Sequence, residues 1–334
     1  MARNKFTWPL INDNISQQDK QVLADFIVNS NRFTNGPKVR EFEESWSKWL
    51  GVKYSVMVGS GAASNYITTA ITRELKGHGG EIIVPPIGWA SDITSVLNTG
   101  FTPVFVDVDL NNMAISYETI KSAINENTKA IVLVHALGFN GINDQIIELA
   151  REHDLLLIED CCEAHGATHK DRKVGTFGDM SCFSFYFGHH MTTIEGGMIC
   201  TDNEEIYELA RMFRSHGMTR EASQSTHEKY AKPDVNPLFT FAVPGYNMRS
   251  SEINAVLGST QLPRLDNAID KRKNNLRIWL EHLDSTLYYT EFDSHGNSNF
   301  ALPLLWKDDK KQKICQILEA EGVEYRLGTA GGGN

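Results

Sequence analysis

Short apolar runs alternate with longer amphipathic segments from about residue 54 to the neighbourhood of Pro244. Runs that are apolar on both faces are typical of strands in a parallel sheet that is covered by helices on both sides. The pattern therefore predicts an α/β domain with a mainly parallel sheet. The expected strands are YSVMV from Tyr54, EIIVP from Glu81, PVFVDV from Pro103, AIVLVHAL from Ala130, LLLIED from Leu155, SCFSFYF from Ser181 and GMICT from Gly197.

Helical periodicity predicts helices between these strands and a different organisation after Pro244. The expected helices of the first part include residues 39–50, 64–75, 144–153 and 204–215. Beyond Pro244 the pattern predicts a long helix at 251–283, an apolar strand NFALPLLW and a helix at 309–321. We therefore expect a large domain over residues 1–245, with an N-terminal arm, and a smaller α+β domain over residues 246–334.

Composition narrows the classes of function. The 334 residues are 41% hydrophobic and 22% charged, as in ordinary globular proteins. A net charge of −10 argues against a nucleic-acid-binding surface. The amino terminus has no apolar leader and no run approaches a membrane span, so a cytoplasmic enzyme is expected. The five cysteines have no paired spacing, which argues against a disulfide framework and an iron–sulfur cluster.

A candidate anion site lies in VMVGSGAASN, where a strand ends in Gly59-Ser60-Gly61-Ala62 and a helix begins. Small residues let backbone N–H groups approach an anion, and the field at a helix N-terminus favours negative charge. The segment predicts a phosphate site. An ordinary strand–glycine–helix turn is the alternative.

A candidate carboxylate, Asp160, ends the buried strand in IEDCCEAHGA. Ligand groups in α/β sheets lie at the carboxyl ends of strands, and a buried carboxylate needs a partner. A helix cap is the alternative role. Cys161, His165 and His169 have the spacing of a metal site on one helical face, but Gly166 disfavours such a helix. No metal is expected.

Two adjacent histidines, His189 and His190, follow the strand that contains Ser184. Adjacent residues on an extended chain point to opposite faces, so the two imidazoles are not expected to bind one ion. The following TTIEGG turn places them in irregular, accessible backbone. One of them is therefore a candidate general base near neutral pH, with a hydrogen-bonded core histidine as the alternative.

Together these segments resemble the DegT/DnrJ/EryC1/StrS sugar aminotransferases, which are fold-type-I pyridoxal phosphate (PLP) enzymes. The resemblance covers nearly the whole chain and implies an aspartate-aminotransferase-like fold. It rests on the ordered motifs GSGAASN, PPIGWAS, FVDVD, IEDCCEAHGA, GTFGDMSCFSFY, EGGMICT, RSHG and GYNMRSSEINAVLGSTQL.

The resemblance implies how the cofactor is held. The groups that would bind its phosphate are the backbone of Ser60, Gly61 and Ala62 and the hydroxyl of Ser184. Trp89 would stack on the ring, and Asp160 would pair with the pyridine nitrogen and keep it protonated.

The resemblance also implies a homodimer with shared sites. Asn247 would reach the cofactor phosphate of the neighbouring subunit. His216, within RSHG, and Arg220, shortly after it, are candidates for contacting the substrate or its diphosphate. The alternative for Arg220 is an ordinary exposed surface arginine.

Two departures from the family pattern suggest a change of chemistry. In the aminotransferases position 189 carries the Schiff-base lysine, whereas this chain has no lysine between Lys173 and Lys229. Position 163 carries Glu163, where the aminotransferases usually have a glutamine hydrogen-bonded toward the ring hydroxyl. With both changes, the chain resembles a lysine-less branch of the family, whose members are 3-dehydratases of GDP-linked 4-keto-6-deoxy sugars.

The lysine-less branch implies pyridoxamine phosphate (PMP) as the working cofactor and L-glutamate as the donor that restores its amine. His189 would take the proton from the cofactor's C4′ carbon, and the products would be ammonia and a 3-deoxy-4-keto sugar. A related branch uses an iron–sulfur cluster on CDP-sugars, but the cysteines here lack the required grouping.

Two other functions stay open. One is an aminotransferase whose lysine has been replaced, which Glu163 argues against. The other is a noncatalytic sugar-nucleotide sensor on the same fold. Because relatives continue beyond EYRLGTAGGGN, we expect the small domain to be truncated.

Overall fold

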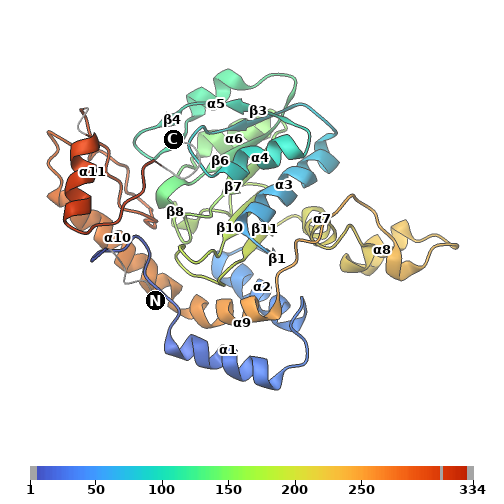
Figure 1. Ribbon diagram of the computed structural model, residues 1–334. Helices are drawn as coiled ribbons and strands as arrows, with labels where there is room; N and C mark the ends of the chain where they lie inside the picture. Colours follow the sequence, from blue (N-terminus) through green and yellow to red (C-terminus); the bar gives the residue numbers. More distant parts are fainter. Residues whose placement is uncertain (1–5, 309–310, 329–334) are drawn as a thin grey trace.

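The computed structural model describes residues 6–308 and 311–328. Its central sheet has seven strands in the order β1-β11-β10-β7-β6-β2-β3 (Figure 1). β11 runs antiparallel to both of its neighbours, and the other pairings are parallel. The strands are β1 (Tyr54–Val58), β2 (Glu81–Val84), β3 (Thr102–Phe105), β6 (Thr128–Val134), β7 (Leu156–Asp160), β10 (Met180–Ser184) and β11 (Gly197–Thr201). The seven strands predicted before Pro244 are thus confirmed, with shifts of a few residues at their ends.

Helices and two short strand pairs complete the described chain. The pairs are β4 (Val108–Asp109) with β5 (Ala114–Ile115), and β8 (Thr168–His169) with β9 (Arg172–Lys173). The α-helices are α1 (Gln17–Asn29), α2 (Pro37–Leu50), α3 (Gly61–Lys76), α4 (Ala90–Asn98), α5 (Tyr117–Ala123), α6 (Asp144–Glu152), α7 (Glu204–Arg214), α8 (Gln224–Tyr230), α9 (Glu252–Gln261), α10 (Leu265–His282) and α11 (Lys311–Ala320).

Alternate residues of each strand enter two different hydrophobic cores. On β6, Ile131 and Leu133 pack with α2, α5 and α6, whereas Val132 and Val134 pack with α3, α4 and α7. Side chains of period two on a strand point to opposite faces, so helices must cover both faces of this sheet. The same alternation carries Glu159 to the first core and Asp160 to the second.

The amino-terminal helix α1 was not predicted. Ser16 and Asp19 form a capping box at its start. Asp19 is buried and accepts two hydrogen bonds from Arg264, at 2.7 and 2.9 Å, so α1 is tied to the junction between α9 and α10. This bidentate contact fixes the N-terminal arm to a distant part of the sequence.

Beyond residue 246 two predictions need correction. The long helix is broken into α9 and α10 by a 3-10 turn at Leu262–Arg264, where Pro263 lacks a backbone N–H group. The prediction of a strand at NFALPLLW is wrong, since the described part of that region has only an isolated bridge between Tyr288 and Trp306. The predicted helix at 309–321 corresponds to α11, and residues 309–310 and the terminal glycine run 331–333 lie outside the described residues.

The backbone groups of that apolar segment are used by other elements, which explains the missing strand. The Phe300 N–H group donates to the Leu137 carbonyl at 2.8 Å. Trp279 Nε1 donates to the Pro303 carbonyl at 2.7 Å. An apolar run cannot form a sheet without a neighbouring strand to pair with.

The division into two domains at residue 245 stays a prediction. In the two described ranges, no helix is long and apolar enough to cross a membrane.

Candidate active site

The ends of three strands form a cradle of small groups. β1 leads into the turn at Ser60 and Gly61, where Ser60 Oγ accepts the Ala63 N–H group at 3.1 Å and caps α3. A Cβ atom on Gly61 would lie 2.6 Å from Ser184 Cβ and 3.1 Å from Cys162 Sγ. Only glycine therefore lets this turn approach Ser184, at the end of β10. The N-terminus of α3 and the Ser184 hydroxyl can together receive a phosphate.

A hydrogen-bonded chain of polar groups runs from Asp160 to the start of α4. Asp160 is 5% exposed, and its Oδ1 accepts the Cys162 N–H group at 2.9 Å. Asn65 Nδ2 donates to Asp160 Oδ2 at 2.8 Å and to Asp92 Oδ1 at 2.6 Å. Asp92 Oδ2 in turn accepts the Trp89 N–H group at 3.0 Å. Asp160 ends β7, and the described residues 161–167 that follow it form no helix, so its alternative role as a helix cap is excluded.

Glu163 lies near Asp160, and Trp89 is connected to Asp160 through Asp92 and Asn65. Glu163 Oε2 accepts the Leu137 N–H group at 2.8 Å. Burial raises the pKa of Glu163 to about 7, and the bond from Leu137 opposes this rise. Glu163 can therefore exchange a proton near neutral pH. Trp89 is 53% exposed, which leaves its aromatic ring free to stack on a planar ligand.

His189 presents a neutral imidazole. Its ring packs against Phe300, with ring centroids 5.1 Å apart, and its buried Nδ1 has no hydrogen-bond partner in the part of the chain that the structure describes. Burial lowers the pKa of His189 to about 4, although the charge of Asp160 opposes this effect. The imidazole is therefore unprotonated at neutral pH, which is the form that can accept a proton.

His190 packs behind the site. It is 4% exposed, and its Nε2 donates to the Ser298 carbonyl at 3.2 Å. Its ring meets the edge of His165 at a centroid distance of 5.1 Å. The His189 ring also contacts His165 and Phe300, and His190 contacts Phe300 as well, so the two rings share neighbours. The expectation that they point to opposite faces of an extended chain is therefore not met, because both residues lie in a bend.

Three predicted residues lie in a separate group on the segment 215–247. Arg220 is exposed and donates to the Leu238 carbonyl at 3.3 Å, and the His216 N–H group donates to the Tyr246 carbonyl at 2.8 Å. Asn247 is exposed and lines a cavity of about 290 Å³ beside Gly59. The recorded contacts of Arg220 and His216 thus keep them within this segment.

The comparisons with known proteins identify the family. A model of the DegT/DnrJ/EryC1/StrS aminotransferase family matches residues 14–328. The chain belongs to this family. The predicted resemblance is thereby confirmed. A relative from Yersinia pseudotuberculosis, GDP-4-keto-6-deoxy-D-mannose 3-dehydratase, is 33% identical over 98% of this chain and 85% of that protein.

Two solved structures confirm the fold class of this family member. The Escherichia coli GDP-4-keto-6-deoxy-D-mannose-3-dehydratase with bound hydrated PLP gives a TM-score of 0.90 at 31% identity, covering 97% of this chain and 86% of that one. A GDP-4-keto-6-deoxymannose-3-dehydratase with a trapped PLP-glutamate geminal diamine gives a TM-score of 0.87 at 31% identity, with the same coverage of both chains.

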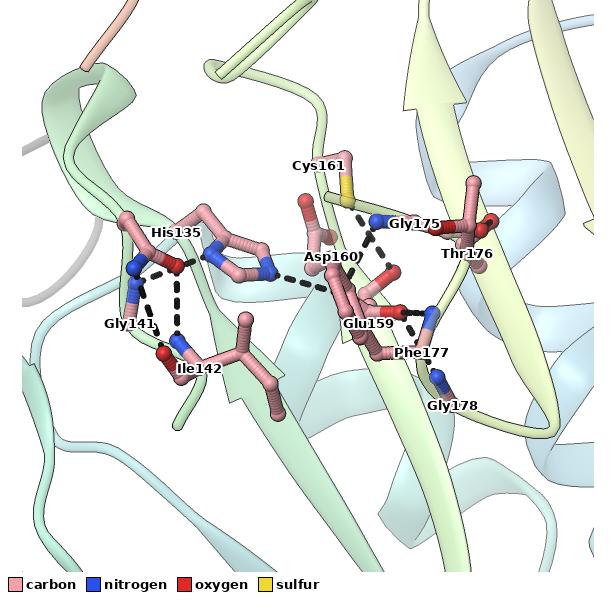
Figure 2. Close-up of polar contacts among 12 residues, drawn as sticks. His135, Gly141, Ile142, Glu159, Asp160, Cys161, Gly175, Thr176, Phe177 and Gly178 are labelled. Carbon is pink, nitrogen blue, oxygen red and sulfur yellow. Dashed lines mark hydrogen bonds and ion pairs between the residues drawn. The ribbon is translucent and has the colours of Figure 1, made fainter. Parts of the chain in front are cut away.

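Sequence reasoning missed a buried cluster in this family member, formed by His135, Glu159 and Cys161. Glu159 accepts the N–H groups of the loop 175–178 on one side and His135 Nε2, at 3.1 Å, on the other (Figure 2). Burial raises the pKa of Glu159, but these donors outweigh it and the net pKa lies below its usual value. His135 Nδ1 accepts the Gly141 N–H group at 3.0 Å, so both ring nitrogens are used.

The cluster contains atoms of the kinds that bind metals, but these atoms are not free to bind one. The three ligand atoms lie within 4.8 Å of one another. The His135 and Glu159 atoms are already hydrogen-bonded, and burial raises the pKa of the Cys161 thiol well above its usual value. Metal ligation requires the thiolate. The geometry therefore fits a hydrogen-bonded brace between β6, β7 and the loop 175–178.

The metal spacing considered from the sequence also fails. Cys161, His165 and His169 do not lie on one helix, because no described helix spans residues 161–169. His165 stacks on Phe183 and Phe185, at centroid distances of 5.7 Å. His169 belongs to β8 and contacts Asp144 at 3.1 Å. These side chains serve three different environments.

Proposed function

We propose that the protein removes the C3 hydroxyl group of a GDP-linked 4-keto-6-deoxy hexose, using PMP and PLP. The observation that carries this proposal is the position of His189. It lies after β10, beside Asp160, where the family has its Schiff-base lysine, and residues 174–228 contain no lysine. An imidazole can accept a proton but cannot form the imine that an aminotransferase needs.

The residues of the site fit the cofactor. Gly61 brings the turn at the N-terminus of α3 close to Ser184, because a Cβ atom there would lie 2.6 Å from Ser184 Cβ. Asn65 Oδ1 and His189 Nδ1 are buried and have no hydrogen-bond partner among the described residues, so a polar ligand could supply a partner to each. Ser60, Gly61, Ala62 and Ser184 would hold the phosphate.

When bound, the cofactor supplies a primary amine that reacts with keto groups and a ring that accepts electrons. Asp160 would hold the pyridine nitrogen, and Trp89 would cover the ring. Neutral His189 would take a proton from the carbon that bears the amine. Glu163 would face the ring hydroxyl, in the place of the usual glutamine. L-Glutamate would restore the amine, in line with the glutamate adduct named for the related structure.

Product analysis tests this proposal. The protein would be incubated with PLP, L-glutamate and a panel of GDP- and CDP-linked 4-keto-6-deoxy sugars, followed by mass spectrometry and an ammonia assay. We expect a 3-deoxy-4-keto GDP-sugar and ammonia. A 4-amino sugar would instead indicate an aminotransferase, and binding without any product would indicate a sensor. Either result would overturn the proposed reaction.

A second test asks how the cofactor is attached. Borohydride treatment of the PLP form should leave no cofactor on residues 174–228, because no lysine is present there. The variant His189→Lys is the positive control, since its new amine should form a yellow, reducible adduct at position 189. Reduced cofactor on another lysine of the site in the unaltered protein would contradict the proposed arrangement.

We further propose a homodimer with shared sites. The segment that carries α8 projects from the body on the side opposite α11 (Figure 1). It bears exposed apolar side chains, which are Val235, Leu238, Phe239, Phe241 and Tyr246. Such a surface suits contact with a second copy. Asn247 at its end would then reach the partner's cofactor, and Arg220 and His216 would contact substrate there. A cytoplasmic location stays a prediction.

Complementation tests the shared site. The variants Asp160→Ala and Asn247→Ala should each be nearly inactive alone. Mixed dimers should regain part of the activity, because half of their sites would combine two intact contributions. Unchanged inactivity, with subunit exchange verified by differently tagged chains, would argue against sharing.

A further inference from the structure

One side-chain amide joins two acidic groups from different elements. Asn65 on α3 donates from Nδ2 to Asp160 at the end of β7 and to Asp92 in the first turn of α4. Asp92 also accepts the backbone N–H group of Trp89. A Cβ atom on Gly88 would lie 2.8 Å from Asp92 Oδ2, so the loop before α4 closes tightly on this carboxyl group. The contacts connect Trp89 to Asp160 through Asp92 and Asn65.

The two acidic groups are close together and poorly compensated. Asp92 is 2% exposed and Asp160 is 5% exposed, and within residues 6–308 and 311–328 neither forms an ion pair. Burial and the neighbouring Asp160 raise the pKa of Asp92 well above its usual value, and Glu163 adds to this rise. Both carboxyl groups accept from the same Asn65 amide nitrogen, and in this buried pair Asp92 is the group that holds a proton.

We propose that Asp92 is a positioning residue, held as a neutral carboxylic acid, that links the ring-stacking Trp89 to Asp160. Asp160 then remains the negative partner of the cofactor's pyridine nitrogen. The inference rests on the proposed function, because that function places the cofactor between these two residues.

The neutral acid satisfies every recorded contact of Asp92. Its O–H group can donate to Asp160, while its oxygens still accept from Asn65 and from the Trp89 N–H group. A second full charge would instead have no cation to balance it. The groups that face Asp92 are Asn65 from α3, the Trp89 N–H group from its own loop, and Asp160 and Glu163 from β7 and the turn after it.

Two substitutions separate charge from shape. Asp92→Asn imitates the neutral acid, since its amide can donate to Asp160 and its oxygen can accept from Trp89, while Asn65 keeps Asp160 and Ser91 as acceptors. Asp92→Ala removes the link. Asp179→Asn is the matched control, because burial also raises the pKa of Asp179 but its carboxylate contacts the Leu157 N–H group at the other end of the strands.

The first measurement is the dissociation constant of PMP for the full-length protein, by titration calorimetry without substrate, between about pH 6 and pH 8. Asp92→Asn should bind within about threefold of the unaltered protein throughout, whereas Asp92→Ala should bind about tenfold more weakly, the equivalent of about 1.4 kcal/mol. Asp179→Asn should have no effect. Weakening by Asp92→Asn as large as that by Asp160→Asn would show that Asp92 acts as a charge, and unchanged binding by Asp92→Ala would exclude positioning.

The second measurement needs no cofactor. The infrared difference spectrum between the unaltered protein and Asp92→Asn at neutral pH should contain a carboxylic-acid C=O band that the variant lacks. Absence of this band would overturn the neutral state even if Asp92→Ala failed to fold. Failure of the unaltered protein to bind PMP would reject the proposed function, whereas normal PMP binding with no effect of Asp92→Ala would reject only this inference.

Discussion

Glu159 and Asp160 are neighbours on β7, yet their carboxyl groups have opposite surroundings. Glu159 is fully buried and accepts hydrogen bonds from Gly175, Phe177, Gly178 and His135. Asp160, on the other face, accepts from Cys162 and Asn65. A carboxylate offers about four acceptor positions, so Glu159 is saturated and Asp160 retains capacity for a ligand.

The difference shows how to separate structural from functional charges in a buried site. A carboxylate with all of its acceptor positions filled by the protein stabilises the fold and has nothing left for chemistry. Asp160 is almost as buried, but the open positions at the end of its strand are where sheets of this type bind ligands. Judged by burial alone, Glu159 would be the stronger candidate for a functional carboxylate. Judged by the number of hydrogen bonds that each carboxylate already accepts, Asp160 is the stronger candidate.

The largest expected effect comes from exchanging each acid for its amide. Glu159→Gln should lower the free energy of unfolding by about 3–5 kcal/mol, because it leaves buried N–H donors facing an NH₂ group. Asp160→Asn should lower it by about 1 kcal/mol, but weaken PMP binding by roughly 10- to 100-fold. Urea unfolding and calorimetry would measure the two quantities. Equal destabilisation by both variants, with PMP binding retained by Asp160→Asn, would remove the distinction.

A second pair of neighbours, His189 and His190, extends the comparison. His189→Asn should keep PMP binding within about threefold and slow product formation by about 10²- to 10⁴-fold, because the neutral imidazole is the proposed base. His190→Asn keeps a donor for the Ser298 carbonyl and should change the rate by less than about tenfold. Single-turnover rates with preloaded PMP would measure both effects. If His189→Asn formed the 3-deoxy product at the normal rate, the base would have to be His190 or Glu163.

Much of this site could be predicted from local sequence. Apolar runs predicted all seven strands of the sheet, and Asp160 and the Gly61 turn follow from the positions where strands end, whereas Ser184 came from the family resemblance. The rule of alternating side chains did not apply to His189 and His190, because these residues lie in a bend and not on an extended chain. The strands and the positions where they end depend on neighbouring residues, and local rules describe them well.

The brace around Glu159 could not be predicted, because its partners are remote in sequence. His135 lies in the apolar run VLVHALG, and Gly175, Phe177 and Gly178 belong to a loop that reads as an ordinary turn. The segment NFALPLLW failed for the opposite reason, since its local pattern fits a strand but its backbone bonds go to Leu137 and Trp279. The break between α9 and α10 has a local signal, because Pro263 cannot donate a backbone hydrogen bond within a continuous helix.

Glu163, in the turn after β7, accepts a hydrogen bond from Leu137, fewer than either acid of that strand, and should show this in its pH dependence. Its folded pKa of about 7 lies above the ordinary value of 4.5, so folding takes up a proton between these values. The unfolding free energy should therefore fall as pH rises through this window, by up to about 3 kcal/mol from this group. The variant Glu163→Gln should not show this decrease, so its free energy of unfolding should rise relative to that of the unaltered protein as pH rises. Urea unfolding of cofactor-free protein between about pH 5 and pH 8 would measure it, and parallel profiles would contradict the assignment.

The smallest expected effect concerns the partner of Glu159. His135→Phe keeps an aromatic ring of similar shape but removes the acceptor for the Gly141 N–H group and one of the four donors to Glu159. A buried N–H group without an acceptor costs about 1–3 kcal/mol, so we expect a loss of about 2 kcal/mol in the free energy of unfolding. The loss should be smaller than for Glu159→Gln, because three backbone donors still hold the carboxylate. PMP affinity should stay within about twofold, since His135 and Glu159 face the core opposite Asp160. A marked loss of PMP affinity without loss of stability would show that the two faces of β7 are coupled, and Glu159 would then belong to the site rather than to the fold.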